Sequence, residues 1–107
     1  MENFVDTTTR VSREIGSGFF GKFIHSEKMS NAYWEAKEGA EIPLHSHVHE
    51  MMANVIEGKL ELTIDGNTRI LDFGTFALIP GPVPHKAKAL TNCKIIDVFY
   101  PVREDYK

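Results

Sequence analysis

The chain has 107 residues, of which 42% are hydrophobic and 25% are charged, and its formal net charge at pH 7 is −3. This length and apolar content predict one small globular domain over residues 1–107, and they exclude a two-domain or disordered protein. Clustered Lys and Arg are absent, so we expect no nucleic-acid partner.

We expect the protein in the cytoplasm, without a membrane partner. No apolar run reaches the roughly 18 residues that span a bilayer, and the start of the chain lacks the features of a signal peptide. Cys93 is the single cysteine, so no intramolecular disulfide can form, as is typical of a reducing compartment.

The apolar residues recur with the two-residue period of β-strands, and no stretch carries a convincing helical stripe. The first ten residues predict a loose tail or an arm that pairs with another subunit. Short strands are then predicted at 19–25, 32–37, 42–47 and 53–57, followed by a hairpin at 59–71 with its turn at 65–67, and by strands at 75–79, 86–90 and 94–100. This pattern predicts an all-β sandwich or barrel. Closing the sheet removes exposed edges and leaves an interior for one ligand.

Three of the five histidines lie between residues 45 and 49. His45 and His47 are two residues apart, so on one strand their imidazoles point to the same face and can bind one metal ion. The alternative is a chance pair at the surface. His85 follows a segment with three prolines, which stiffen the chain and lower the entropy lost when the loop is ordered. By itself His85 fits a ligand or a solvent-facing turn equally, but with the pair it predicts a three-histidine metal site.

The last strand carries an acid among apolar residues. Ile95, Asp97 and Phe99 share one of its faces, and burying an acid there is costly unless it is paired or used. If this face lines the barrel mouth, Asp97 can act as a general acid or base, and Arg103 can bind a substrate carboxylate bidentately. The alternative is an ion pair between Asp97 and Arg103 that closes the strand end.

Four further residues are predicted to have structural roles. Tyr33 and Trp34 are expected in the core or in a dimer interface, although one of the two rings can also stack on a sugar at the barrel mouth. His25 is expected to be a hydrogen-bonded or surface histidine rather than a ligand. Cys93 is interpreted as a turn residue, with no base nearby in the sequence that would make it a nucleophile.

Two motifs between residues 39 and 100 resemble the cupin family. Gly39, five further residues, His45-x-His47 and then Glu57-Gly58 resemble the first cupin motif; Gly74, five further residues and Pro80-x-Pro82-x-x-His85 resemble the second. The resemblance implies a single cupin barrel, which is a jelly roll or double-stranded β-helix, with a divalent metal (Ni, Zn, Mn, Fe or Cu) on His45, His47 and His85. Small cupins commonly pair, so a homodimer built through sheet packing is expected.

Met51 departs from this family pattern. The cupin motif has Glu or Gln four residues after the second histidine, as a further metal ligand, and here that position is Met51. A thioether is a poor donor to hard cations and a tolerable one to soft ions. Met51 is therefore either a weak ligand or, as we favour, a core residue. Its neighbours His49 and Glu50 are candidate replacements.

The end of the chain resembles a particular group of cupins. Asp97-Val98-Phe99, Pro101 and Arg103-Glu104-Asp105-Tyr106 are similar to the small cupins of pectin and alginate catabolism that linearise 4,5-unsaturated monouronates. The resemblance implies that Asp97, Phe99 and Arg103 lie over the metal and act on a small-molecule sugar acid. Two alternatives to this enzyme stay open. One is a non-catalytic binding module, which Met51 at the ligand position favours. The other is a small dioxygenase, which is weakened by the missing carboxylate ligand.

Overall fold

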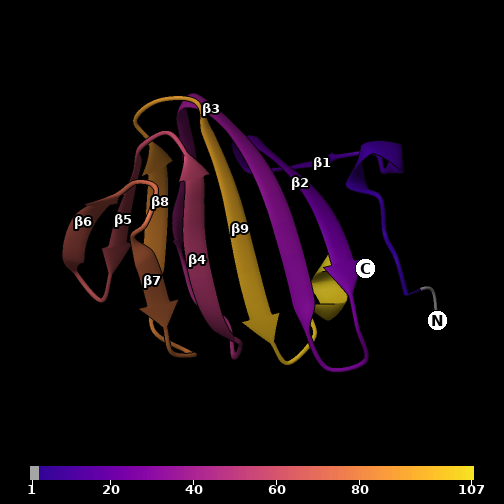
Figure 1. Ribbon diagram of the computed structural model, residues 1–107. Coiled ribbons are helices and arrows are strands. Elements are labelled where there is room, and N and C mark those ends of the chain that lie inside the picture. The colour runs from indigo at the N-terminus through magenta and orange to yellow at the C-terminus, as the bar shows by residue number, and fades with distance from the viewer. Residues whose placement is uncertain (1–2) are drawn as a thin grey trace.

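The protein is a nearly closed antiparallel β-barrel (Figure 1). The computed structural model describes residues 3–107. Its elements are the 3-10 helix η1 (Thr7–Thr9), the strands β1 (Arg13–Ile15), β2 (Ser17–His25), β3 (Ser30–His45), β4 (Glu50–Glu57), β5 (Leu60–Ile64), β6 (Asn67–Leu71), β7 (Phe76–Ile79), β8 (His85–Ala89) and β9 (Cys93–Tyr100), and the 3-10 helix η2 (Glu104–Tyr106). The all-β prediction is confirmed. Between residues 3 and 107, no helix is long and apolar enough to cross a membrane.

The strands follow the order β6-β5-β8-β3-β9-β4-β7, with β2 added to β3 and β1 added to β2. In Figure 1, β2, β3, β9, β4 and β7 lie across the front, and β5, β6 and β8 lie towards the left. The apolar faces of the strands turn inward, as the two-residue period requires. Buried side chains between them include Phe19, Trp34, Val55, Leu62, Ile79, Ile95 and Phe99.

β3 is one long strand, where the sequence predicted two at 32–37 and 42–47. Its first part pairs with β2 and β9, and its second part pairs with β8, with a register shift between Ile42 and His45. Gly39 lies between the two predicted strands with φ of 84°, and the left-handed conformation of this glycine lets the strand change direction without ending. β3 ends at His45, so the prediction that His45 and His47 share a strand was wrong.

The predicted hairpin is confirmed. β5 and β6 pair from Leu60 with Leu71 to Ile64 with Asn67. The turn consists of Asp65 and Gly66, whose φ values of 49° and 81° are those of the two-residue turns that suit twisted hairpins. Cys93, expected in a turn, is instead the buried first residue of β9, where its thiol contacts the carbonyl oxygens of Lys59 and Thr91.

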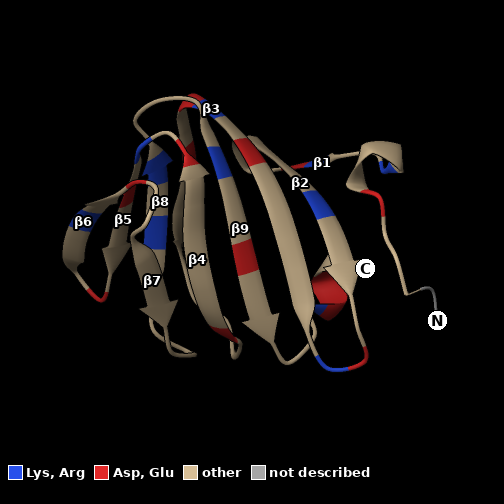
Figure 2. Cartoon of the chain, viewed as in Figure 1, with Lys and Arg blue, Asp and Glu red and all other residues tan. Residues whose placement is uncertain are grey.

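Strand β9 carries two charged side chains, those of Lys94 and Asp97. In Figure 2 the middle of β9 carries one acidic residue, which the sequence of this strand identifies as Asp97.

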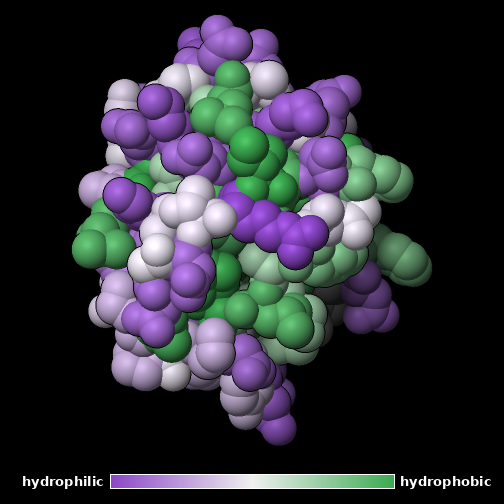
Figure 3. Space-filling model, turned by 90° about the vertical axis from the view of Figure 1, so that its left-hand side faces the viewer, coloured by the Kyte–Doolittle hydropathy of each residue, from purple (hydrophilic) through white to green (hydrophobic). Residues whose placement is uncertain are grey.

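Figure 3 shows apolar side chains mixed with polar ones on the left-hand side of the Figure 1 view. Exposed apolar side chains on β4, β7 and β9 are Met52, Phe76, Leu78 and Tyr100. They are candidates for the sheet packing of a homodimer, which stays a prediction.

The predicted arm at 1–10 lies only partly within the described residues, since residues 1 and 2 fall outside them. Lys22 on β2 donates to the carbonyl oxygen of Thr7 over 2.9 Å, so η1 is anchored to its own subunit. Whether the arm also pairs with another subunit stays a prediction.

The connection between β4 and β5 provides a test of the close packing. Gly58 has φ of 90°, and a Cβ there would collide with the carbonyl oxygen of Asn92 and lie 2.8 Å from Thr91 Oγ1. Gly74 has φ of 94° with open space around it. We expect Gly58→Ala to lower the free energy of unfolding by roughly 3 kcal/mol, and Gly74→Ala by about 1 kcal/mol for the left-handed backbone alone. Urea denaturation measures both, and equal losses would contradict the close approach at Gly58.

Candidate functional site

The barrel encloses a pocket of about 330 Å³. Its wall is largely apolar, with a small set of polar groups, as is typical of small-molecule sites. All seven residues that the sequence singled out for the site line this pocket: His45, His47, Met51, His85, Asp97, Phe99 and Arg103. Further lining residues are Arg13, Trp34, Asp105 and Tyr106. Of these, Trp34 alone has a site role that was predicted from the sequence, as a ring that stacks on a sugar.

Three histidines converge in the pocket. One nitrogen from each of His45, His47 and His85 lies within 4.8 Å of the others. His45, the last residue of β3, is the cross-strand partner of His85, the first residue of β8. His47 joins them from the connection between β3 and β4, and its ring centre lies 4.8 Å from that of His85. The three come together by strand pairing and loop geometry.

Each of these histidines donates its Nδ1 proton to a backbone carbonyl oxygen. The acceptors are Pro43 for His45 (2.8 Å), His49 for His47 (3.1 Å) and Val83 for His85 (2.9 Å). A carbonyl oxygen can only accept, so in the neutral ring Nδ1 carries the proton and Nε2 keeps its lone pair. All three residues therefore present the same tautomer, with Nε2 as the donor atom.

Burial favours the neutral form of His47 and His85. It lowers the pKa of His47 to about 4, with further lowering by the charge of Arg103, and it lowers the pKa of His85 as well. Nε2 of His47 is buried without a hydrogen-bond partner, which is rare unless a ligand completes it. Three imidazole nitrogens around one point fit a divalent metal ion.

The neighbours of the histidines differ in their placement. Met51 is buried, lines the pocket and pairs with Phe99 across β4 and β9, as expected of a core residue; its ligation stays a prediction. Glu50 is exposed on β4. His49 donates from Nε2 to the carbonyl oxygen of Val102 over 3.2 Å. Within residues 3–107, neither Glu50 nor His49 belongs to the group that could hold the metal.

Asp97 lies in the same pocket as the histidines, on β9. Its Oδ2 accepts a hydrogen bond from Trp34 Nε1 over 3.0 Å, and its Oδ1 is buried without a hydrogen-bond partner. Burial raises the pKa of Asp97 to about 7, although the hydrogen bond from Trp34 and the charge of Arg103 oppose this. Near neutral pH both protonation states are populated, which suits a group that accepts and returns a proton.

Arg103 is buried and pairs with Asp105, not with Asp97. Its Nε and Nη2 donate to the two carboxylate oxygens of Asp105 over 2.9 Å and 2.7 Å. Its guanidinium also lies 4.1 Å from the ring centre of Tyr106 and 4.8 Å from that of Phe99. The alternative of an Asp97–Arg103 ion pair is therefore not formed. The spacing Arg103-x-Asp105 was the signal available in the sequence.

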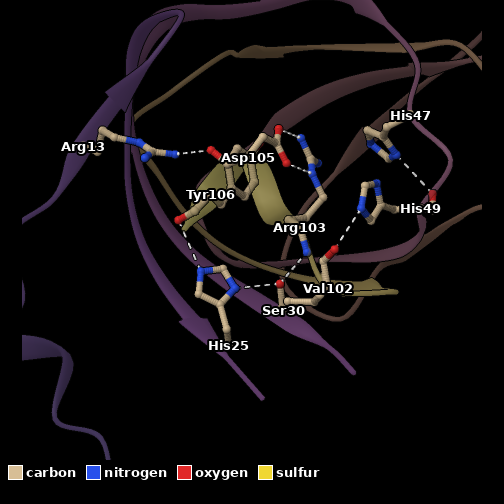
Figure 4. A network of polar contacts seen from close by, with 9 residues as sticks. All are labelled: Arg13, His25, Ser30, His47, His49, Val102, Arg103, Asp105 and Tyr106. Atoms are coloured by element: carbon tan, nitrogen blue, oxygen red, sulfur yellow. Dashed lines mark hydrogen bonds and ion pairs between the residues drawn. The ribbon is translucent and has the colours of Figure 1, made fainter. Parts of the chain in front are cut away.

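Hydrogen bonds hold the segment that carries Arg103 against the barrel (Figure 4). The backbone N–H of Arg103 donates to Ser30 Oγ over 2.8 Å, and Ser30 Oγ lies 2.8 Å from His25 Nδ1. His25 Nε2 donates to the carbonyl oxygen of Tyr106 over 3.2 Å. Because the Tyr106 carbonyl oxygen can only accept, Nε2 carries the proton of the neutral ring, so Nδ1 accepts a hydrogen bond from Ser30 Oγ. His25 is thus a hydrogen-bonded structural residue, as expected.

The cupin domain family matches residues 32–99, which is more than half of the chain. The chain belongs to the cupin family.

Solved cupins share the whole fold. An RmlC-like cupin from Shewanella frigidimarina NCIMB 400 superposes with a TM-score of 0.93 at 28% identity, over 100% of this chain and 97% of the other. KdgF from Halomonas sp. superposes with a TM-score of 0.92 at 24% identity, over 100% of both chains. This second likeness is one of fold.

A curated relative matches part of the chain. Quercetin 2,3-dioxygenase of Bacillus subtilis (strain 168) is 46% identical over 50 residues, which are 45% of this chain. The match spans only 14% of that protein. Together with the three-histidine group, the cupin fold supports a divalent metal at the site.

Removing any one ligand tests the metal site. We expect His45→Ala, His47→Ala and His85→Ala each to weaken metal binding at least about tenfold, because only three nitrogen donors meet there. His25→Ala is the matched control, since His25 bonds to Ser30 and Tyr106 and should leave the metal content unchanged. Elemental analysis and equilibrium dialysis of protein without an affinity tag measure this. Full metal content in His47→Ala would contradict the assignment.

Asp97 links stability to pH. Its pKa is raised above the unfolded value, so the folded protein binds this proton more tightly, and stability falls as pH rises from about 4 to about 7. Asparagine does not titrate. We expect Asp97→Asn to be more stable than the parent by roughly 2 kcal/mol at pH 8 and no more stable at pH 4.

Urea denaturation with a chelator present, at both pH values, measures this difference. Asp72→Asn serves as the control, because Asp72 is exposed and should behave like the parent at either pH. A gain in stability that is the same at pH 4 and pH 8 would contradict the raised pKa of Asp97.

Proposed function

We propose that this cupin is a metal-dependent enzyme that opens the ring of a 4,5-unsaturated uronate to the linear 4-deoxy-5-keto acid. One observation carries the proposal: a single pocket of about 330 Å³ is lined by three convergent histidines, a buried carboxyl oxygen on Asp97 and the guanidinium of Arg103. This combination offers a metal, a proton carrier and an anion contact to one small acid.

His45, His47 and His85 would hold the metal through Nε2, and a set of imidazoles suits Ni, Zn, Mn, Fe or Cu. When bound, a divalent ion supplies Lewis acidity that polarises the substrate oxygens. The backbone carbonyls that accept from each Nδ1 keep the rings oriented and increase their basicity.

Asp97 supplies both proton transfers. In its ionised form it accepts the proton of the anomeric hydroxyl while the bond between the anomeric carbon and the ring oxygen breaks, which leaves an aldehyde and an enolate. It then delivers that proton to carbon 4 of the enolate, and carbon 5 becomes the ketone. The product is an isomer of the substrate, and no redox partner is required. A carboxyl with pKa about 7 is suited to both steps.

Trp34, Phe99 and Arg103 place the reacting groups. The indole N–H of Trp34 donates a hydrogen bond to Oδ2 of Asp97, so Oδ1 is the oxygen that accepts and releases the proton. Phe99 forms part of the pocket wall beside His47, with ring centres 5.8 Å apart. Arg103 attracts the substrate carboxylate to the end of the pocket where η2 lies.

The comparisons support this choice of substrate at the level of fold. The last strand resembles that of small cupins that linearise unsaturated uronates, and the fold likeness includes KdgF, a uronate-linearising cupin. We also propose that the protein is a cytoplasmic homodimer with a small-molecule sugar acid as its partner. The free, buried Cys93 and the exposed apolar side chains of β4 and β7 support this.

A second candidate function is a small dioxygenase. The 46% identity to quercetin 2,3-dioxygenase over 50 residues favours it. Such an enzyme requires a redox metal and consumes oxygen, whereas ring opening requires neither. Oxygen uptake with a phenolic substrate therefore distinguishes the two.

The ring-opening activity can be measured directly. Purified protein should bleach the ultraviolet absorbance of a 4,5-unsaturated uronate faster than the spontaneous reaction. We expect Asp97→Asn to lower kcat by about 100-fold or more, because no other carboxyl in the described pocket is both buried and unpaired. Chelation of the metal should have a similar effect, and Asp72→Asn should retain full activity.

An unchanged rate of bleaching in Asp97→Asn would contradict the role of Asp97 in proton transfer. Protein that contains no metal and binds the acid equally well with a chelator would favour a non-catalytic binding module. Oxygen consumption without bleaching would favour the dioxygenase.

A further inference from the structure

A second arginine lies at the pocket, on the short strand β1. Arg13 lines the pocket, and its Nη2 donates to the backbone carbonyl oxygen of Asp105 over 3.1 Å (Figure 4). Its guanidinium carbon is 4.9 Å from the ring centre of Phe23 and 5.8 Å from that of Tyr106. Contacts with two aromatic rings and one carbonyl oxygen therefore hold the exposed side chain of Arg13 in position.

The local sequence makes room for this arrangement. Arg13 pairs with Gly21 across β1 and β2. A Cβ at Gly21 would collide with the rings of Trp34 and Phe23, so glycine lets these rings fill the space beneath β1. The Phe23 ring then stacks on Tyr106, with ring centres 4.4 Å apart, and forms the surface over which Arg13 lies.

The two arginines differ in how their charge is matched. Arg103 has a carboxylate partner, because Asp105 occupies its Nε and Nη2 in a bidentate pair. Arg13 forms no ion pair within residues 3–107, and its one hydrogen bond goes to a neutral carbonyl. Both guanidinium groups lie against Tyr106, so they share one end of the pocket. Arg13 is thus the unmatched permanent cation there.

This difference limits how a substrate can bind. Asp105 already occupies the edge of Arg103 formed by Nε and Nη2, which is the edge that can bind a carboxylate bidentately. Nη1 is the nitrogen that stays available to a substrate. Arg13 keeps N–H donors that no described residue accepts from. A carboxylate that enters this end of the pocket can be neutralised by Arg13 without displacing Asp105.

We propose that Arg13 is a substrate-binding residue that, together with Nη1 of Arg103, holds the carboxylate of a singly charged sugar acid at the pocket mouth. The identity of the acid rests on the proposed function, whereas the preference for an anion over a neutral sugar rests on the unmatched charge. Arg13 determines specificity for the acid and takes no part in the proton transfers.

The test uses glucuronate, a saturated uronate that lacks the 4,5 double bond, with glucose as its neutral counterpart. Isothermal titration of the metal-loaded protein gives the Kd of each ligand for the parent, Arg13→Gln and Arg13→Lys. Arg10→Gln is the matched control, because Arg10 is exposed and lies outside the pocket. Circular dichroism and urea denaturation establish that all the variants are folded.

We expect Arg13→Gln to raise the Kd of glucuronate about threefold to tenfold, with an exposed charge-assisted hydrogen bond lost. Arg13→Lys should recover part of the affinity, and Arg10→Gln should match the parent. In the ring-opening assay Arg13→Gln should raise KM by a similar factor and leave kcat unchanged.

Two results would overturn the inference: glucuronate that binds the parent no more tightly than glucose, or an unchanged Kd and KM in Arg13→Gln. Failure of the proposed function is a separate result. If the parent opens no ring but binds glucuronate in a manner that depends on Arg13, the anion site stands and the assigned reaction falls.

Discussion

The pairing of β3 with strands on both sides of the barrel is the constraint on which the site depends. One end of this 16-residue strand pairs with β9, and the other end pairs with β8. The first pairing brings Trp34 next to β9, where its indole can reach Asp97. The second sets His45 opposite His85. A single strand thus places one member of the three-histidine group and the indole that hydrogen-bonds to Asp97, so their separation is fixed by the backbone ladder and not by flexible loops.

The parts of this arrangement that local patterning controls were predictable from the sequence. The hairpin at 59–71 was found because turn residues and alternation are local signals, and the inward face of β9 follows from the two-residue period. The three histidines were found because spacing and the resemblance to cupins agreed. The continuity of β3 was missed because Gly39 breaks strands in most settings, and only pairing with two neighbours keeps this one extended.

The carboxylate that pairs with Arg103 could not be predicted from the sequence, for a different reason. Asp97 and Asp105 are both close to Arg103 in the chain, and either carboxylate could have matched it. In the structure Trp34, which is 63 residues from Asp97 in the sequence, donates a hydrogen bond to one oxygen of the Asp97 carboxylate. With Asp97 held on β9 by the indole, the carboxylate of Asp105 on η2 reaches Arg103 instead. Such choices depend on which donors arrive from distant segments.

Loss of hydration has opposite effects on the acid and on the bases of this pocket. It raises the pKa of Asp97 and lowers the pKa of His47 and His85, so in each case the neutral form is favoured. Arg103 is as buried as these groups, but Asp105, whose side chain is largely exposed, matches its charge at little cost in hydration. The pocket interior is therefore close to neutral, and its one unmatched permanent charge lies on Arg13 at the mouth. With Arg13 and Arg103 both against Tyr106, the positive charge of the pocket lies beside η2, and the neutral nitrogen donors lie on β3, β8 and the connection after β3.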